Sequence, residues 1–300
     1  DHSLQVSFPS MTLLTLIQTS SFAFGLLAVV LGLIIGSFLN VVIYRTPVVL
    51  MRRWQQDCQE LTGRTTNAAT HEKFNLVTPR SRCPHCGHAI TALENIPVVS
   101  YLWLRGKCSA CREPISLRYP LVELFSAALA AVTAWHFGFN AAGIAAIILT
   151  WLLIALAFID IDHQLLPDVM VLPFLWIGLL LNLFNVFTTL PQAVIGAVAG
   201  YLSLWLVFHL FKLITGKEGM GYGDFKLFAL FGAWLGWQSL PLIILLASFI
   251  GALIGISLIV FRGRDRAQPL PFGPYLAAAG WVAMLWGDEI MRQYLQIAHF

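Results

Sequence analysis

The chain has 300 residues, of which 58% are hydrophobic and only 11% are charged, with a formal net charge of +3 at pH 7. Soluble domains carry a charge on about a quarter of their residues, so this composition excludes an ordinary soluble enzyme. The apolar residues form long uncharged runs, which indicates an all-α, polytopic membrane protein. We expect such a protein to contact membrane lipids and to have no nucleic-acid partner.

The N-terminal part of the chain is interpreted as a short remnant followed by one membrane helix. Residues 1–10 carry no motif, and Met11 follows them where a native chain could begin, so we expect a cloning remnant. Residues 11–44 form the first membrane domain, with a transmembrane helix predicted at Ser21–Tyr44. This run is too long for a secretory signal, and it leads into Arg45 instead of a small-residue cleavage site.

Positions 45–118 are polar, with eleven Lys or Arg residues, and we expect them to form a cytoplasmic loop between the first two membrane helices. Within this loop stand two CxxC pairs separated by 21 residues. Such pairs are typical of a tetrahedral zinc site, because each tight turn presents two thiolates. The metal would supply folding energy to a loop that cannot bury much core, so we expect a structural Zn²⁺. Its predicted ligands are Cys83, Cys86, Cys108 and Cys111.

Other interpretations of this loop are weaker but stay open. A reducing cytoplasm argues against disulfides, and redox-active or unpaired thiols are the remaining alternative to zinc. His85 and His88 could replace a cysteine ligand, although histidines in such turns are more often exposed to solvent. Gly87 and Gly106 suit tight turns beside the two pairs. Cys58 stands outside the motif and is expected to have no role.

Residues 119–290 form the predicted membrane core of seven helices, and 291–300 a periplasmic tail. Three uncharged stretches, 124–159, 169–211 and 227–261, are each expected to form two spans. The last stretch would be about 52 Å long as one helix, whereas the hydrocarbon core of a bilayer is about 30 Å thick. The predicted turns lie at Phe137–Gly143, Asn185–Gln192 and Gly236–Pro241, and the final span at 267–287. With the first helix, this gives about eight transmembrane helices.

The orientation follows from the positive charges in the connections. With eight spans, seventeen of the 18 Lys and Arg residues fall on one side, and Arg292 stands alone on the other. Because cytoplasmic connections are enriched in Lys and Arg, the richer side faces the cytoplasm. Both termini are then periplasmic.

Two carboxylate-bearing motifs lie at the cytoplasmic face. The sequence FIDID ends the third span with Asp160 and Asp162, and the sequence GYGD opens the sixth span with Asp224. Two carboxylates brought together can hydrolyse an amide, since one takes a proton from water while the other donates one to the carbonyl. We therefore predict that Asp160 and Asp224 are catalytic, with Asp162 as the alternative to Asp160. Glu218 and Lys226 flank the second motif and would orient Asp224 or mark the membrane interface.

The remaining acidic residues near this face have simpler explanations. Asp168 follows Pro167 and is expected to be the N-cap of the fourth span. Glu123 would favour the N-terminus of the second span and pair with Arg118.

Paired carboxylates also permit a different class of function. An ion- or proton-coupled transporter uses intramembrane carboxylates to relay protons, and this is the alternative to a peptidase. Here both carboxylates lie at one interface, and no pair of broken helices marks two symmetric halves. A zinc-bearing assembly scaffold would leave the glycine-rich GYGD turn unexplained.

Six motifs in a fixed order give the chain a family resemblance. They are GSFLNVVIYR at 36–45, FNLVTPRSRCPHC at 74–86, NIPVVSYLWLRGKCSAC at 95–111, ISLRYPLVEL at 115–124, FIDIDHQLLPD at 158–168 and EGMGYGDFKL at 218–227. With them the chain resembles the bacterial type IV prepilin peptidases, the GxGD aspartic membrane proteases of type IV pilus and type II secretion systems. The resemblance runs from the first span almost to the C-terminus. Thr46 stands where leucine is common, and both aspartate motifs are complete.

The resemblance implies a bifunctional enzyme of the bacterial inner membrane. Such enzymes cut the basic leader from prepilins or pseudopilins on the cytoplasmic side and N-methylate the new terminus with S-adenosylmethionine. The two family aspartates match Asp160 and Asp224, and the four family cysteines match those of the loop. No glycine-rich Rossmann signature marks a methyl-donor site. The resemblance favours the cytoplasmic loop near Glu94, Asn95 and Pro97 for that activity.

Overall fold

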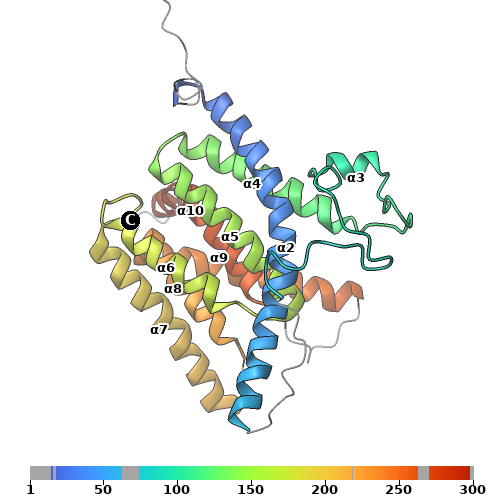
Figure 1. The fold of residues 1–300 in the computed structure, drawn as a ribbon. Coiled ribbons are helices and arrows are strands. Elements are labelled where there is room, and N and C mark those ends of the chain that lie inside the picture. Colours follow the sequence, from blue (N-terminus) through green and yellow to red (C-terminus); the bar gives the residue numbers. More distant parts are fainter. Residues whose placement is uncertain (1–14, 16–17, 63–73, 218, 263–269, 298–300) are drawn as a thin grey trace, which may run out of the picture.

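The computed structural model describes residues 15, 18–62, 74–217, 219–262 and 270–297. Residues 1–10, interpreted above as a remnant, and the last three residues of the tail lie outside this part of the chain. The regular secondary structure of the described part is helical, and two isolated β-bridges lie in the irregular segment between α2 and α4. Figure 1 shows its elements, which are α2 (Ser21–Leu61), α3 (Val99–Trp103), α4 (Arg118–Phe137), α5 (Ala141–His163), α6 (Asp168–Asn182), α7 (Leu190–Thr215), α8 (Tyr222–Leu235), the 3-10 helix η1 (Trp237–Ser239), α9 (Leu240–Arg262) and α10 (Gly273–Ile297).

The three predicted turns within the uncharged stretches are confirmed as ends of helices. Gly138 ends α4 with φ of 70°, and Gly236 ends α8 with φ of 82°. Between α6 and α7 the left-handed position is taken by Asn185, with φ of 52°. Glycine and asparagine tolerate this backbone region best, which explains why the uncharged stretches break where they do.

The first helix begins at the predicted residue but continues far beyond the predicted end. The hydroxyl of Ser20 accepts a hydrogen bond from the Ala23 N–H and caps α2, which then passes Tyr44 and ends at Leu61. Its 41 residues correspond to about 62 Å. Pro47 lies inside α2 without ending it. The polar residues that follow include many good helix formers, which favour continuation of the helix past the membrane edge.

Within the described residues, five helices are long and apolar enough to cross a membrane: α2, α4, α5, α7 and the stretch Trp237–Phe261, which covers η1 and nearly all of α9. Helix α6 is apolar but has only 15 residues. Helix α8 has 14 residues, or about 21 Å, which is shorter than a hydrocarbon core of about 30 Å. The protein is thus a multi-pass membrane protein with short helices among its long ones.

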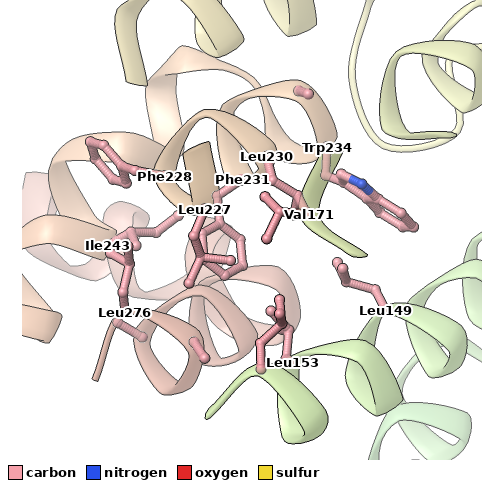
Figure 2. Packing of buried hydrophobic residues seen from close by; sticks show 14 of the residues in the cluster. Leu149, Leu153, Val171, Leu227, Phe228, Leu230, Phe231, Trp234, Ile243 and Leu276 are labelled. Carbon is pink, nitrogen blue, oxygen red and sulfur yellow. The ribbon is translucent and has the colours of Figure 1, made fainter. Parts of the chain in front are cut away.

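Helix α8 lies at the centre of the bundle. Ten of its 14 residues are buried, among them Trp234 and Phe231, which are covered almost completely. Figure 2 shows its side chains pointing in several directions, towards Leu149 of α5, Val171 of α6 and neighbouring residues of α9 and α10. A helix that is apolar on all sides is typical of a buried or membrane-spanning position. Here α6, α7, α9 and α10 contact α8, and Leu149 and Leu153 of α5 belong to the same buried cluster.

Glycines allow the backbones of α7 and α8 to touch. A Cβ atom added to Gly196 would lie 2.4 Å from the carbonyl oxygen of Gly232, and one added to Gly232 would lie 2.1 Å from that of Gly196. Both distances are far below van der Waals contact, so each position excludes a side chain. Close approach of this kind is how helices in membranes obtain dense packing.

The far end of α8 is fixed by one buried amide. Asn182 Nδ2 donates to the carbonyl oxygens of Ala233 and Trp234, at 2.9 Å each. Its Oδ1 accepts from the backbone N–H groups of Phe187 and Thr188 at 3.0 and 3.1 Å. The last carbonyls of a helix have no partner within the helix, and this side chain satisfies two of them. Helix α8 is therefore held at a set depth relative to α6.

Candidate functional site

Asp160 lies in the last turn of α5, where the helix ends with Gln164 in the left-handed conformation at φ of 50°. The Asp160 side chain is buried, with the residue 6% exposed. Its Oδ2 accepts a hydrogen bond of 3.0 Å from the backbone N–H of Gly273, the first residue of α10. The first N–H groups of a helix have no partner within the helix, so this donor is available to hold a carboxylate.

Gly273 is a component of the site that the sequence analysis missed. A Cβ atom at this position would lie 2.6 Å from Asp160 Oδ2 and 3.2 Å from Leu166 Cδ1. The backbone of α10 therefore reaches the carboxylate only because the residue is glycine. The run Pro271-Phe-Gly273-Pro274 marks a helix start in the sequence, since proline is favoured in the first turn. Nothing in the sequence pairs it with Asp160.

Asp224 lies in the first turn of α8 and is also 6% exposed. Its Oδ1 has no hydrogen-bond partner among the described residues. Buried polar atoms nearly always have partners, so an unpartnered carboxylate oxygen is a strong sign of a functional position. The residue before it, Gly223, is as constrained as Gly273, because an added Cβ would lie 2.7 Å from Leu166 Cβ.

The structure brings Asp160 and Asp224 together at one end of the bundle. Leu166, on the connection after α5, touches both Gly223 beside Asp224 and Gly273 beside Asp160. The two carboxylates are close enough to interact electrostatically. The C-terminal end of α5 and the N-terminal ends of α8 and α10 therefore converge on one pair of buried acids.

Asp162, the alternative to Asp160, has a different environment. The Arg118 guanidinium at the start of α4 donates to both of its carboxylate oxygens, with 3.1 Å between Nη1 and Oδ1. The same guanidinium lies over the ring of Phe158, 5.3 Å from its centroid. Asp162 is partly exposed and fully paired, whereas Asp160 is buried. The geometry favours Asp160 as the partner of Asp224.

Two expectations about nearby acids are wrong. Glu123 does not pair with Arg118, because its Oε2 accepts a 2.7 Å hydrogen bond from the Val98 N–H. Asp168 is not the N-cap of α6: Pro167 occupies the cap position and Asp168 is the first helical residue. Proline already has the extended backbone that a cap requires, and the next residue can enter the helix.

Lys226 neither contacts Asp224 nor stands unpaired. Its Nζ lies 2.7 and 2.6 Å from the two carboxylate oxygens of Asp168. Glu218, on the other side of the glycine turn, lies outside the described residues. Lys226 therefore forms an ion pair with α6 and does not orient Asp224 by direct contact.

The four loop cysteines form a second site, separate from the acids. All four Sγ atoms lie within 4.8 Å of one another, with 3.8 Å between Cys83 and Cys111 and 4.0 Å between Cys86 and Cys108. Tetrahedral zinc with Zn–S bonds of about 2.3 Å requires S···S distances of about 3.8 Å. The donor set and its spacing therefore fit a tetrahedral zinc ion.

The two CxxC turns have the same backbone structure, 25 residues apart. The N–H of Cys83 donates to His88 O and that of Cys108 donates to Glu113 O, at 2.9 Å in both cases. A β-bridge closes each turn, from Arg82 to Ala89 and from Lys107 to Pro114. The left-handed position is taken by Gly87 in the first turn and by Arg112 in the second, with φ of 72° and 60°. Gly106, expected beside the second pair, lies two residues before Cys108 and also has a positive φ, of 67°.

Hydrogen bonds favour the ionised forms of two groups in residues 74–117, here called the cysteine module. The backbone N–H groups of Cys86 and His85 lower the pKa of the Cys83 thiol to about 7, and the thiolate is the form that binds metal. Hydrogen bonds from Ser109 and Thr91 lower the pKa of Glu94 to about 2. Because Glu94 also lies 3.4 Å from His88 Nε2, it links the first turn to the second.

The cysteine module, to one side of the bundle in Figure 1, is attached to the membrane helices at two points. Buried Glu123 of α4 accepts the N–H of Val98, which has φ of 58° at the start of α3. Buried Arg45 of α2 donates to the carbonyl oxygens of Asn75 and Leu76 at 3.1 and 3.4 Å. Both contacts use charged groups to satisfy backbone groups of the loop.

Comparison with known families agrees with this combination of sites. Residues 30–137 match the bacterial peptidase A24 N-terminal domain, and residues 147–256 match the type IV leader peptidase family. The first match covers the cysteine module, and the second covers Asp160 and Asp224. The chain belongs to the type IV leader peptidase family.

Individual relatives match over nearly the whole chain. It is 55% identical to the prepilin leader peptidase/N-methyltransferase of Pseudomonas aeruginosa over 97% of this chain and 100% of the relative. It is 56% identical to the protein of the same name from Aeromonas hydrophila over 88% of this chain and 91% of the relative. The Legionella pneumophila relative is 48% identical over 88% of this chain and 92% of its own length. No solved structure matches the chain.

Proposed function

We propose that this protein removes the leader peptide from prepilins or pseudopilins and then N-methylates the new N-terminus. The relatives carry both activities in their names, prepilin leader peptidase and N-methyltransferase. The observation that carries the peptidase assignment is the pair of buried carboxylates, Asp160 and Asp224, at converging helix ends. Burial and mutual repulsion allow such a pair to hold one proton between them, which is the state an aspartic peptidase requires.

In this mechanism the ionised carboxylate removes a proton from a water molecule, and the water oxygen attacks the carbonyl carbon of the scissile amide. The protonated carboxylate donates its proton to the carbonyl oxygen. When the tetrahedral intermediate collapses, the C–N bond breaks and the leaving amine accepts a proton. Asp224 Oδ1 is free to take part in these transfers, while the Gly273 N–H fixes the orientation of Asp160.

The site is proposed to face the cytoplasm of a bacterium from the inner membrane. Eight helices, α2 and α4 to α10, would span the bilayer, with both termini in the periplasm. The short helix α8 can do so because other helices cover it and it need not meet lipid along its length. The side that carries seventeen of the 18 Lys and Arg residues is then cytoplasmic and can contact anionic lipid headgroups.

The cysteine module is proposed to bind structural Zn²⁺ through its four thiolates. The metal would supply folding energy to a segment that has little core of its own.

S-adenosylmethionine is the proposed methyl donor and would supply the methyl group for the terminal amine, which loses a proton on transfer. The segment with Glu94, Asn95 and Pro97 is the proposed region for this reaction on the basis of the family resemblance; Glu94 there accepts a hydrogen bond from the Thr91 N–H.

The peptidase assignment is tested by cleavage of a purified prepilin with the full-length protein in liposomes. Asp160→Asn and Asp224→Asn should each abolish cleavage, and both proteins should keep a cooperative thermal transition. Asp162→Asn is the matched control, since it removes a neighbouring carboxylate that pairs with Arg118, and it should retain appreciable activity. Cleavage at the wild-type rate by either dyad variant would show the assignment to be wrong. Total loss in Asp162→Asn would move the first aspartate to that position.

A further inference from the structure

The ion pair between Lys226 and Asp168 links the helix that carries Asp224 to the segment that follows Asp160. Lys226 Nζ contacts both oxygens of Asp168, at 2.7 and 2.6 Å. The Lys226 side chain is only 27% exposed, whereas that of Asp168 is 51% exposed. Because residues two apart on a helix point in different directions, Lys226 is directed away from Asp224 and towards α6.

The same segment also contacts α8 on the other side of Asp224. Leu166 lies against Gly223, where an added Cβ would come within 2.7 Å of it. Leu166 and Asp168 therefore hold α8 at Gly223 and at Lys226, one residue before and two residues after the carboxylate. Asp160 is six residues before Leu166, in the last turn of α5, and Leu166 lies on the short connection between α5 and α6.

We propose that Lys226 and Asp168 are positioning residues that set the separation of the two catalytic carboxylates. This inference rests on the proposed peptidase function. Apolar contacts alone would let the first turn of α8 slide or fray, since helix ends lack part of their hydrogen bonding. An ion pair to the first residue of α6 fixes that turn in register with Asp160. Exposed ion pairs contribute little to the free energy of unfolding. We therefore expect this pair to act mainly on the position of Asp224 relative to Asp160.

The test is a double-mutant cycle on prepilin cleavage by the full-length protein in liposomes. Lys226→Met and Asp168→Asn should each lower kcat about 10- to 100-fold, because a misplaced catalytic group costs rate of that order. KM and the midpoint of thermal unfolding should stay near their wild-type values. The double variant should be no slower than the slower single variant, since a pair that acts as one unit is not additive. Lys226→Arg keeps the ion pair and should retain most of the activity.

A second ion pair provides the control. Glu289→Gln removes the partner of Arg292 at the other end of α10, 2.9 Å away, and should leave kcat unchanged. The proposal is overturned if both single variants cleave at the wild-type rate, or if their effects multiply in the double variant. If a single variant does not fold, kcat of the double variant is the deciding measurement. A folded double variant with wild-type kcat also overturns the proposal. If the peptidase assignment itself were wrong, Asp224→Asn would still cleave prepilin, and this result is independent of the ion-pair variants.

Discussion

At the level of single residues, two of the buried carboxylates accept hydrogen bonds from backbone N–H groups of distant segments. Asp160 accepts from Gly273, 113 positions later, and Glu123 accepts from Val98. Both contacts require the donor backbone to come very close. At Gly273 the absence of a side chain permits this approach, so the glycine is as necessary to the geometry as the acid.

Gly273→Ala is therefore expected to reduce prepilin cleavage at least tenfold, on the scale of a misplaced catalytic group. The added Cβ would lie 2.6 Å from Asp160 Oδ2 and must displace either α10 or the carboxylate. The initial rate of cleavage in liposomes measures the effect. Gly25→Ala is the matched control, since nothing lies within 4 Å of the added atom, and it should leave the rate unchanged. Equal rates for the two variants would contradict the role of Gly273.

The equivalent left-handed positions of the two CxxC turns, Gly87 and Arg112, predict opposite effects of substitution. Gly87→Ala should weaken the module by about 1–2 kcal/mol, because an L-residue is strained at φ of 72° although no atom would clash. Arg112→Gly relieves the same strain in the second turn and should be neutral or stabilising. Competition with a chromophoric chelator for zinc measures both. If the same chelator concentration removed half of the zinc from both variants, the two turns would not be structurally equivalent.

At the level of helices and turns, much of the fold could be predicted from the sequence, because its signals are local. Uncharged runs predicted the membrane helices, and Gly138 and Gly236 lie at two of the predicted turns between them. The paired CxxC spacing led directly to the cysteine cluster. The long extension of α2 was missed because polar helix formers after Arg45 carry no membrane signal. The contacts of Gly273 and Lys226 join residues far apart in sequence, and a single sequence holds no record of such contacts.

Asn182 shows how much one side chain can determine the placement of a helix. Replacing it by leucine leaves two carbonyls of α8 and two N–H groups of the next turn without partners, at about 1–3 kcal/mol for each buried group. Asn182→Leu should lower the thermal midpoint substantially and reduce cleavage with it. Asn182→Asp, which keeps the accepting oxygen for Phe187 and Thr188, should fall between wild type and Asn182→Leu. A leucine variant as stable as wild type would contradict the capping role.

At the level of the whole molecule, the protein combines a membrane bundle with a four-cysteine module to one side of it. The bundle holds the acids through α5, α8 and α10, whereas the module is attached to α2 and α4 through Arg45 and Glu123. The two sites thus depend on different helices. Peptidase activity and metal binding should therefore be separable by substitution.

Thiol counting tests both the metal and the orientation. In the native protein, only Cys58, which is exposed at the end of α2, should react with a membrane-impermeant maleimide. The four clustered cysteines should react only after a chelator has removed the metal, which raises the count from one to five. In oriented membrane vesicles, Cys58 should be labelled from the cytoplasmic side. Labelling of all five cysteines without chelator would contradict a closed zinc site.

The central position of α8 has a consequence for how the protein is made. Helices leave the ribosome in chain order, yet α8 depends for its cover on α9 and α10, which are synthesised after it. Asp160 likewise receives its hydrogen bond only when Gly273 has emerged. Both acids are therefore synthesised before all the elements that cover α8 and hold Asp160 are present. On the proposed mechanism, we expect cleavage activity only once α10 has joined the bundle.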